Sequence, residues 1–481
     1  MENLKKKRSI SPYILVILSF LIVILVGSFL LTMPWANNYN AWLWNYKTAE
    51  GNVITYLDCL VTAVSATCVT GVFTYHQPIG QVLSFGGQVV LLSLIQIGGL
   101  GFITILTFII TLFNSRLKFK NRLFIAQMVN STNFADVVKF VRKLILITFI
   151  CEGVGFLLSL PVFLNLYKDN IFMALWNSLF HSISAFNNAG FDIFHGNSLI
   201  GGITGSNGIT ITGPLYYYFG IITMILIIVG GISFMVLIEI FSGKKKPSQW
   251  GILTKIVLAS TAFLILFGTI TLIITDCFKG EGCMTVFDAL FQSVTCRTAG
   301  FATYAQDSIS PAGKVVGCLL MFIGGSPIST AGGIKTTTIF MVVLAILSYF
   351  SNGRVKAFHR TYSSNMVVKA MSLMTIALFV LLLGYIGLIS FGLQPGIKYA
   401  DTGLTTDSSS IFAYLVFSCF GTVGLCSGIE PYLSVGGKFV ICLLMFLGRI
   451  GPITFFQIVQ ENFNKESTGA YKCVEEDFLL G

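Results

Sequence analysis

Four short glycine motifs, each lying between two long apolar runs, constrain the fold of this chain more than any other feature. They are T-C-V-T-G-V (67–72), N-N-A-G-F (187–191), R-T-A-G-F (297–301) and T-V-G-L (422–425). Their aligned glycines are Gly71, Gly190, Gly300 and Gly424, and no gap is needed in the residues before them. Each motif follows a short segment with helical apolar spacing. Glycines in membrane helices often serve close helix packing alone, but four aligned copies favour one unit repeated around an axis.

The apolar runs are long enough to cross a membrane. Of the 481 residues 54% are hydrophobic and 10% are charged, and runs of about 18 or more apolar residues, the length of a transmembrane helix, recur. Basic clusters at 5–8, 116–122, 244–246 and 354–360 place those segments in the cytoplasm, as the positive-inside rule requires. The net charge of +10 therefore reflects membrane topology and not a nucleic-acid partner. The sequence predicts an all-α, multi-pass membrane protein with both termini cytoplasmic.

Each repeat is expected to hold a span, a short re-entrant helix, a glycine loop and a second span. The eight predicted spans are 12–32, 88–113, 144–166, 216–241, 252–275, 314–350, 370–392 and 437–459. The four short helices are 56–66, 172–185, 285–295 and 408–419. The repeats are 1–115, 116–243, 244–352, whose second span is broken, and 353–481, which ends in a short cytoplasmic tail. This arrangement predicts a pseudo-fourfold pore.

The glycine loops have the chemistry of a cation filter. Non-helical backbone at membrane depth is tolerated only when it is buried in protein or lines a water-filled cavity. Its carbonyl oxygens can replace the hydration shell of a monovalent cation, and glycine supplies the positive φ that aligns them. The short helices end at the loops, so their negative dipole ends favour cations there. The residues predicted to bind potassium through backbone carbonyls are Val69, Thr70, Gly71, Asn188, Ala189, Gly190, Thr298, Ala299, Gly300, Thr422, Val423 and Gly424.

The segment G-G-S-P-I-S-T-A-G-G-I-K (324–335) interrupts the second span of the third repeat. Its glycines, proline and hydroxyl residues cannot continue an α-helix. Because it lies on the cytoplasmic side of the filter, we expect a movable plug; a plain hinge or kink is the alternative. The predicted gate residues are Gly324, Gly325, Ser326, Ser329, Thr330, Ala331, Gly332, Gly333, Lys335 and Arg449.

Charged residues inside membrane segments are costly and usually functional. Arg449 is expected either to reach the carbonyls of segment 324–335 or to add a positive barrier. Lys335 either serves the gate or extends to the cytoplasmic surface. We expect Arg297 to point away from the ion path and to brace its loop through an acid such as Asp288. Asp192 either attracts cations at the mouth or is an ordinary solvated acid.

Other classes of function have less support. A secondary porter that couples sodium or protons to a solute would show two inverted halves and buried coupling carboxylates, but the repeats are four and parallel, and Glu152 is the single acid well inside a predicted span. A membrane enzyme would need clustered His, Cys or carboxylates, and the four His show no metal spacing. Cys277 and Cys283 are expected to face outward together, so a disulfide between them is one option.

Together these motifs resemble the Trk/Ktr/HKT superfamily of potassium transporters. The matching stretches are V-T-A-V-S-A-T-C-V-T-G, F-H-S-I-S-A-F-N-N-A-G-F-D, R-T-A-G-F, G-G-S-P-I-S-T-A-G-G-I-K-T-T-T and G-R-I-G-P-I-T. The chain looks most similar to the Ktr membrane subunit. The resemblance extends from the first predicted span to the last.

The resemblance implies potassium uptake across the plasma membrane by a homodimer with one pore per subunit. It also implies a cytosolic nucleotide-binding regulatory subunit, no covalently bound cofactor, and sodium as a stimulating ion in some members. The four filter glycines, the intramembrane gate 324–335 and the gate-facing Arg449 carry over onto this sequence, and glycine at position 71 favours potassium. Ile328 departs from the glycine usual in relatives, and a bulky residue there is expected to stiffen the gate.

Overall fold

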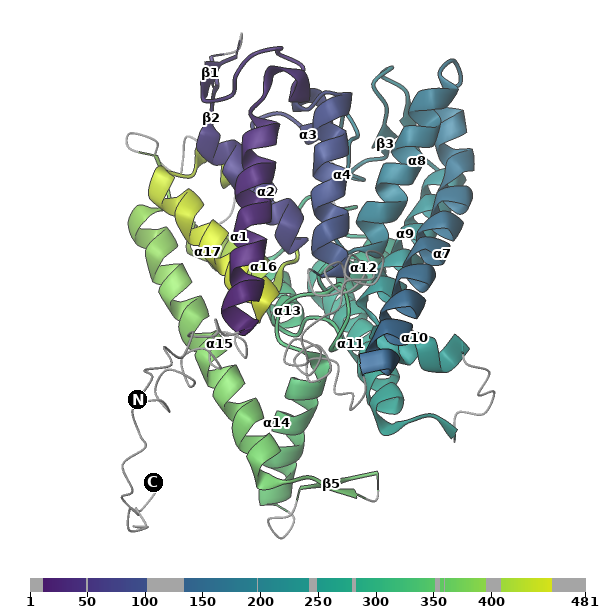
Figure 1. Cartoon of the computed structure of the whole chain (residues 1–481), viewed down its shortest axis with the longest axis vertical. Coiled ribbons are helices and arrows are strands. Elements are labelled where there is room, and N and C mark those ends of the chain that lie inside the picture. Colours follow the sequence, from purple (N-terminus) through teal and green to yellow (C-terminus); the bar gives the residue numbers. More distant parts are fainter. Residues whose placement is uncertain are drawn as a thin grey trace, which may run out of the picture.

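The structure is a computed structural model of a helix-rich chain (Figure 1). It describes residues 12–48, 51–101, 134–196, 198–241, 249–278, 283–350, 355–358, 360–394 and 408–451. Within these ranges, four helical segments are long and apolar enough to cross a membrane: 139–166, 214–231, 252–276 and 364–391. Many of their Leu, Ile and Phe side chains are exposed, as expected of helices that face lipid. The predicted all-α membrane class is confirmed at this level.

Four apolar helices each precede a shorter, more buried one. The longer helices are α1 (Pro12–Leu31), α7 (Phe134–Leu166), α11 (Ile252–Asp276) and α15 (Ser364–Phe391). The shorter helices are α2 (Tyr56–Cys68), α8 (Ile171–Phe186), α12 (Val286–Thr295) and α16 (Ser408–Gly421). Two of these short helices, α2 and α12, begin at capping boxes, which are formed by Thr55 with Asp58 and by Thr285 with Asp288. Each short helix ends at one of the four glycine motifs.

A further helix follows each glycine loop: α4 (Phe85–Leu100), α9 (Pro214–Gly231), α13 (Pro311–Phe322) and α17 (Val435–Ile450). Three of them begin in the same way. The hydroxyl oxygens of Ser84, Ser310 and Ser434 accept the backbone N–H groups of Gly87, Gly313 and Gly437, respectively. A serine N-cap three residues before a glycine therefore recurs at the same place in three segments.

The helices close into a ring through their contacts. Within each segment the long helix packs against its short helix, as in α1 with α2 and α7 with α8. Between segments, α4 packs on α8, α9 on α12, α13 on α16, and α17 on α2. The last of these contacts joins the fourth segment to the first. The short helices and their loops are thereby held in the middle of the molecule, where the buried core lies.

Two of the predicted second spans are described only in part. Helix α4 ends at Leu100 before Gly101 (φ 75°), and α17 ends at Ile450 before Gly451 (φ 80°). The rest of the predicted spans 88–113 and 437–459 lies outside the described residues. A helix cannot pass through a left-handed residue without breaking its hydrogen-bond ladder.

The predicted continuous span 216–241 is wrong. Helix α9 ends at Gly231 and α10 (Phe234–Phe241) begins after a break. The carbonyl oxygens of Gly230 and Gly231 are used instead by the segment that separates α13 from α14 (Thr336–Tyr349), the break predicted from sequence. The span of the second segment is therefore interrupted beside the interruption in the third.

The β-structure is peripheral. In the described part of the chain it consists of three two-stranded antiparallel hairpins: β1 (Asn45–Lys47) with β2 (Val53–Thr55), β3 (Ile203–Thr204) with β4 (Thr210–Ile211), and β5 (Lys356–Ala357) with β6 (Arg360–Thr361). Figure 1 shows β1, β2 and β3 at one end of the molecule, with β5 at the opposite end beyond α14 and α15. Short helical turns at 79–82 (α3), 34–36 (η1) and 430–432 (η4) complete the loops.

Candidate functional site: a ring of four glycine loops

The four glycine loops share one backbone conformation. In each, the residue two positions before the glycine is left-handed: Val69 (φ 57°), Asn188 (58°), Thr298 (81°) and Thr422 (50°). The glycines have positive φ as well: Gly71 (103°), Gly190 (67°), Gly300 (86°) and Gly424 (91°). A non-glycine residue in this region costs about 1–3 kcal/mol and persists only where its surroundings impose it. The same conformation at all four positions supports the alignment made from sequence.

A buried hydroxyl at the end of each short helix holds the loop. Ser65 Oγ and Ser418 Oγ accept the N–H groups of Gly71 and Gly424 at 3.0 and 3.1 Å. In the other two loops the hydroxyl donates to the carbonyl of the residue after the glycine.

The Ser184 hydroxyl donates to Phe191 O, seven residues later in the chain, whereas the Thr295 hydroxyl donates to Phe301 O, six residues later. The hydroxyl of the third loop lies one residue closer to its glycine: Thr295 is five residues before Gly300, whereas the serines of the other loops are each six residues before theirs. The left-handed residues and the glycines still align without a gap.

The loops meet one another in a closed ring. A Cβ added to Gly71 would lie 2.7 Å from Ala189 O, and one added to Gly190 would lie 2.6 Å from Ala299 O. Likewise, Gly300 faces the carbonyl oxygen of Val423, and Gly424 faces that of Thr70. Each glycine thus faces the residue that precedes the next glycine, and the fourth loop returns to the first. The ring gathers backbone carbonyls from all four segments and leaves no room for side chains at the glycines.

A vestibule opens on one side of the ring. It encloses about 1370 Å³ including its open mouth, and all four glycines line it. Asp192, Asp307 and Glu430 also line it, whereas no Lys or Arg is among the described lining residues. Asp192 therefore lies at the entrance of the ring, which favours the first of the two roles considered for it. A cavity lined by carboxylates attracts cations.

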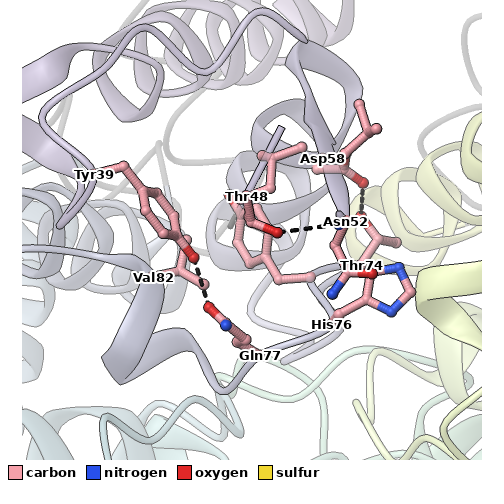
Figure 2. Close-up of a pocket in the computed structure, with 11 residues that line it drawn as sticks. Tyr39, Thr48, Asn52, Asp58, Thr74, His76, Gln77 and Val82 are labelled. Carbon is pink, nitrogen blue, oxygen red and sulfur yellow. Dashed lines mark hydrogen bonds between the residues drawn. The ribbon is translucent and has the colours of Figure 1, made fainter. Parts of the chain in front are cut away.

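A smaller cavity of about 270 Å³ shares Tyr75, His76 and Gln77 with the vestibule wall. Figure 2 shows Asp58 and Thr74 pointing toward one another in it. The Oδ1 atom of Asp58 also accepts Lys438 Nζ at 2.6 Å, and both side chains are at least nine-tenths buried. Because Asp58 lies on α2 and Lys438 on α17, this ion pair joins the first segment to the fourth. Sequence reasoning missed it, since the partners are 380 residues apart.

A buried polar network supports the second loop from behind. Glu152 on α7 accepts hydrogen bonds from Gln96 Nε2 at 3.0 and 3.2 Å and from Asn187 Nδ2 at 2.9 Å. Asn187 directly precedes the left-handed Asn188. The single acid well inside a predicted span therefore holds a glycine loop in position. The sequence showed Glu152 as unusual but gave no indication of its partners.

The interrupted segment 324–335 lies on the other side of the ring. A Cβ on Gly332 would collide with the Thr422 side chain of the fourth loop. Ser326 N donates to Gly231 O at 3.1 Å, and Thr330 Oγ1 donates to Gly230 O at 2.9 Å. The segment is thus a non-helical turn beneath the ring, attached to the end of α9.

The two cations assigned to this segment both bind its carbonyls. Lys335 Nζ donates to Ala331 O at 2.6 Å, so its ammonium group folds back onto the segment and does not extend to the surface. Arg449 Nη1 donates to Thr330 O, and Nη2 donates to Gly98 O at the end of α4. Arg449 therefore takes the first of its two expected arrangements. Arg449, which lies on α17, thereby links segment 324–335 to the first and fourth segments.

Arg297 points away from the ring, but its predicted partner is wrong. Its guanidinium is buried against α11, with Nη1 and Nη2 3.5 Å from Thr261 O and Oγ1. Asp288 instead accepts the Thr285 hydroxyl at 2.6 Å and caps α12. Asp288 and Arg297 lie at opposite ends of that helix, roughly 13 Å apart at 1.5 Å per residue. A contact between them is therefore excluded.

Two further positions differ from simple expectation. Cys277 and Cys283 are both free thiols, so the disulfide considered from sequence is not formed.

Ile328 is left-handed (φ 53°), and its side chain is 40% exposed. Its carbonyl accepts Phe234 N at 2.9 Å. A left-handed backbone favours glycine, which is the residue that the resemblance leads us to expect at position 328.

The chain is similar to known cation transport proteins over almost its whole length. The sequence model of the TrkH family, described as a cation transport protein, matches residues 36–465. The potassium/sodium uptake protein NtpJ of Enterococcus hirae is 31% identical, with 100% of both chains covered. The Ktr system potassium uptake proteins B and D of Bacillus subtilis are 31% and 32% identical. The match with protein B covers 94% of this chain and 93% of the relative, and the match with protein D covers 98% of each.

The fold is also found in a solved structure. The crystal structure of the potassium transporter TrkH from Vibrio parahaemolyticus has a TM-score of 0.65, covering 96% of this chain and 87% of that one at 18% identity. At this identity the likeness concerns the fold. The relatives are ion transporters, so the prediction that the chain is not an enzyme is confirmed. The chain belongs to the TrkH family of cation transport proteins, a family of potassium and sodium uptake transporters.

Proposed function

We propose that this chain is the pore-forming subunit of a Trk/Ktr-type system for potassium uptake across the plasma membrane. The observation that carries the proposal is the closed ring in which each glycine faces the carbonyl of the next loop. Carbonyl oxygens are weak-field ligands that suit a large monovalent cation. The filter is formed by the three residues that end in each ring glycine, and potassium binds at their backbone carbonyls.

The ring has the architecture of four repeats around one pore. The repeats are 1–115, 116–243, 244–352 and 353–481, with eight spans, four pore helices (α2, α8, α12 and α16) and both termini cytoplasmic. The cyclic packing of each second-span helix on the next short helix supports this arrangement. So does the recurrence of the same loop backbone four times.

Segment 324–335 is the intramembrane gate of this pore. It lies against the fourth filter loop, opposite the vestibule, and interrupts the path that a cation leaving the ring would follow. Its attachments are hydrogen bonds to the carbonyls of Gly230 and Gly231 at the end of α9 and a hydrogen bond from Arg449, which also donates to Gly98 O at the end of α4. Such bonds can be exchanged for water when the segment moves, which suits a plug better than a fixed kink.

The subunit works with partners. Relatives are named as potassium uptake proteins of a Ktr system, which supports a regulatory partner. The chain forms a homodimer, and the partner is a cytosolic nucleotide-binding subunit. Potassium is the transported ion and sodium a stimulating ion, and no covalently bound cofactor is required. The coupled secondary porter is the alternative function. In the described residues Glu152 already accepts three hydrogen bonds, which suits a positioning group better than a coupling carboxylate.

The proposal is tested by cation flux into liposomes that hold the purified protein, with potassium, rubidium and sodium compared. We expect potassium flux well above sodium flux, and we expect Gly300→Ser to reduce the potassium flux and narrow this gap. A Cβ at Gly300 would press on Val423 O and lie 3.0 Å from the Gly190 Cα.

Gly208→Ser is the matched control, because Gly208 also has positive φ (75°) but open space around it. Equal potassium and sodium flux in the parent, or flux that requires an added solute, would reject the filter in favour of the porter.

A further inference from the structure

Two oxygen atoms in the wall of the vestibule are buried without a hydrogen-bond partner in the described structure. They are Oε1 of Glu430 and Oγ of Ser427, in side chains that are 3% and 7% exposed. Both residues line the vestibule that leads to the ring. An unpaired buried oxygen is destabilising, and most of all on a carboxylate. Two such atoms in one cavity wall are the chemistry of an oxygen-ligand site for a cation.

The local backbone presents these atoms beside the ring. The segment leaves the fourth filter glycine, where Cys426 Sγ donates to Gly424 O at 3.3 Å. It then turns at Gly428 (φ 90°), whose N–H donates to Glu430 Oε2 at 3.1 Å. This bond fixes one carboxylate oxygen, whereas Oε1 is buried and has no hydrogen-bond partner among the described residues. The first turn of η4 (Glu430–Tyr432) thus orients Glu430.

We propose that Glu430 and Ser427 form a monovalent-cation site in the vestibule wall, from which cations enter the ring of glycine loops. This inference rests on the proposed function of the ring. One carboxylate and one hydroxyl, completed by water, suit a monovalent ion, whereas divalent ions in proteins generally take several anionic oxygens. The site raises the local concentration of cations at the filter, in the way that charge-lined clefts concentrate a substrate.

A structural role for Glu430 makes a different prediction. If the carboxylate served only to close the 424–430 turn through Gly428, Glu430→Gln would keep this role, since the amide oxygen also accepts an N–H. The substitution would then leave the concentration dependence of transport unchanged. The neutral isostere therefore separates a ligand from a turn-closing group.

The experiment is rubidium flux into liposomes at a series of external rubidium concentrations. We expect Glu430→Gln to raise the half-saturating concentration at least about fivefold, which is the factor that one charge at about 4 Å supplies even in water. Ser427→Ala should raise it less, and the double variant should resemble Glu430→Gln, because two ligands of one ion are not additive. The maximal rate should not change.

Asp169→Asn is the matched control, since it removes an exposed acid that does not line the vestibule. A parent that conducts rubidium while Glu430→Gln keeps the parental half-saturation would overturn the site and leave the proposed function intact. A fall in maximal rate alone would also overturn it, because that result indicates a damaged loop. A parent without rubidium flux would reject the pore itself and the site with it.

Discussion

At the residue scale, Ile328 lies in a backbone conformation that its side chain opposes. A β-branched residue at φ 53° is strained by about 1–3 kcal/mol, and its 40% exposed side chain gains little from packing. We expect Ile328→Gly to raise the unfolding free energy by about 1 kcal/mol, since relief of strain exceeds the entropy that glycine adds to the unfolded chain. Thermal unfolding in detergent measures the change.

Ile328→Val is the comparison variant, because valine is also β-branched and keeps the strain while losing one exposed methylene. It should unfold at the parental temperature. A glycine variant that unfolds below the valine variant would mean that the Ile328 side chain stabilises the segment by contacts that exceed its strain.

The positive φ of the four ring glycines could be predicted from sequence, but the conformation of their neighbours could not. A glycine flanked by apolar residues at four aligned sites is visible in the chain, and all four have positive φ. The left-handed Val69 and Thr298 are not visible, because β-branched residues disfavour that region and only the surrounding protein imposes it. The predicted contact between Arg297 and Asp288 is wrong for a related reason. Their charges are complementary, but α12 separates the two residues.

At the element scale, segment 324–335 is a loop whose ends already meet. Ile323 and Ile334 form a parallel β-bridge, so removing residues 324–333 joins neighbouring positions and leaves α13 and α14 in place. We expect this deletion to raise potassium flux, because it removes the proposed gate beneath the ring. Flux into liposomes measures it. Unchanged or abolished flux in a variant that remains folded would identify the segment as a structural kink.

Arg449→Gln is the milder form of the same test. It removes charged hydrogen bonds to Thr330 O and Gly98 O, each worth about 1.5–3 kcal/mol, so it should shift the closed segment toward the open state about tenfold or more. Arg360→Gln, which removes an exposed cation on β6, should leave the flux unchanged.

The break in the third span was predictable, whereas the break in the second was not. Segment 324–335 carries its own helix-breaking residues. The stretch from α9 to α10 is mostly apolar and has no proline at the break, where the carbonyls of Gly230 and Gly231 accept hydrogen bonds from a segment about 100 residues away. Periodicity describes one segment at a time, so a break that depends on a distant partner cannot be found by it.

At the scale of the whole molecule, closure of the ring depends on contacts between the last segment and the first. At two junctions between segments, the contact is made by the residue four positions after a serine N-cap. On α4, Gln88 accepts Trp176 Nε1 on α8 at 2.7 Å, and on α17, Lys438 donates to Asp58 on α2 at 2.6 Å. The chain therefore uses a neutral pair at one junction and an ion pair at the junction that closes the circle.

This ion pair should respond asymmetrically to substitution. Asp58→Asn leaves the Lys438 ammonium buried without its counter-ion, which should lower the unfolding free energy by about 3–5 kcal/mol. The double variant Asp58→Asn with Lys438→Gln removes both charges and reproduces the neutral kind of pair found at Gln88, so it should be more stable than either single variant. Thermal unfolding of the purified protein in detergent measures all three. Losses that simply add in the double variant would mean that the two side chains stabilise their own segments independently. Closure of the ring would then depend on helix packing alone.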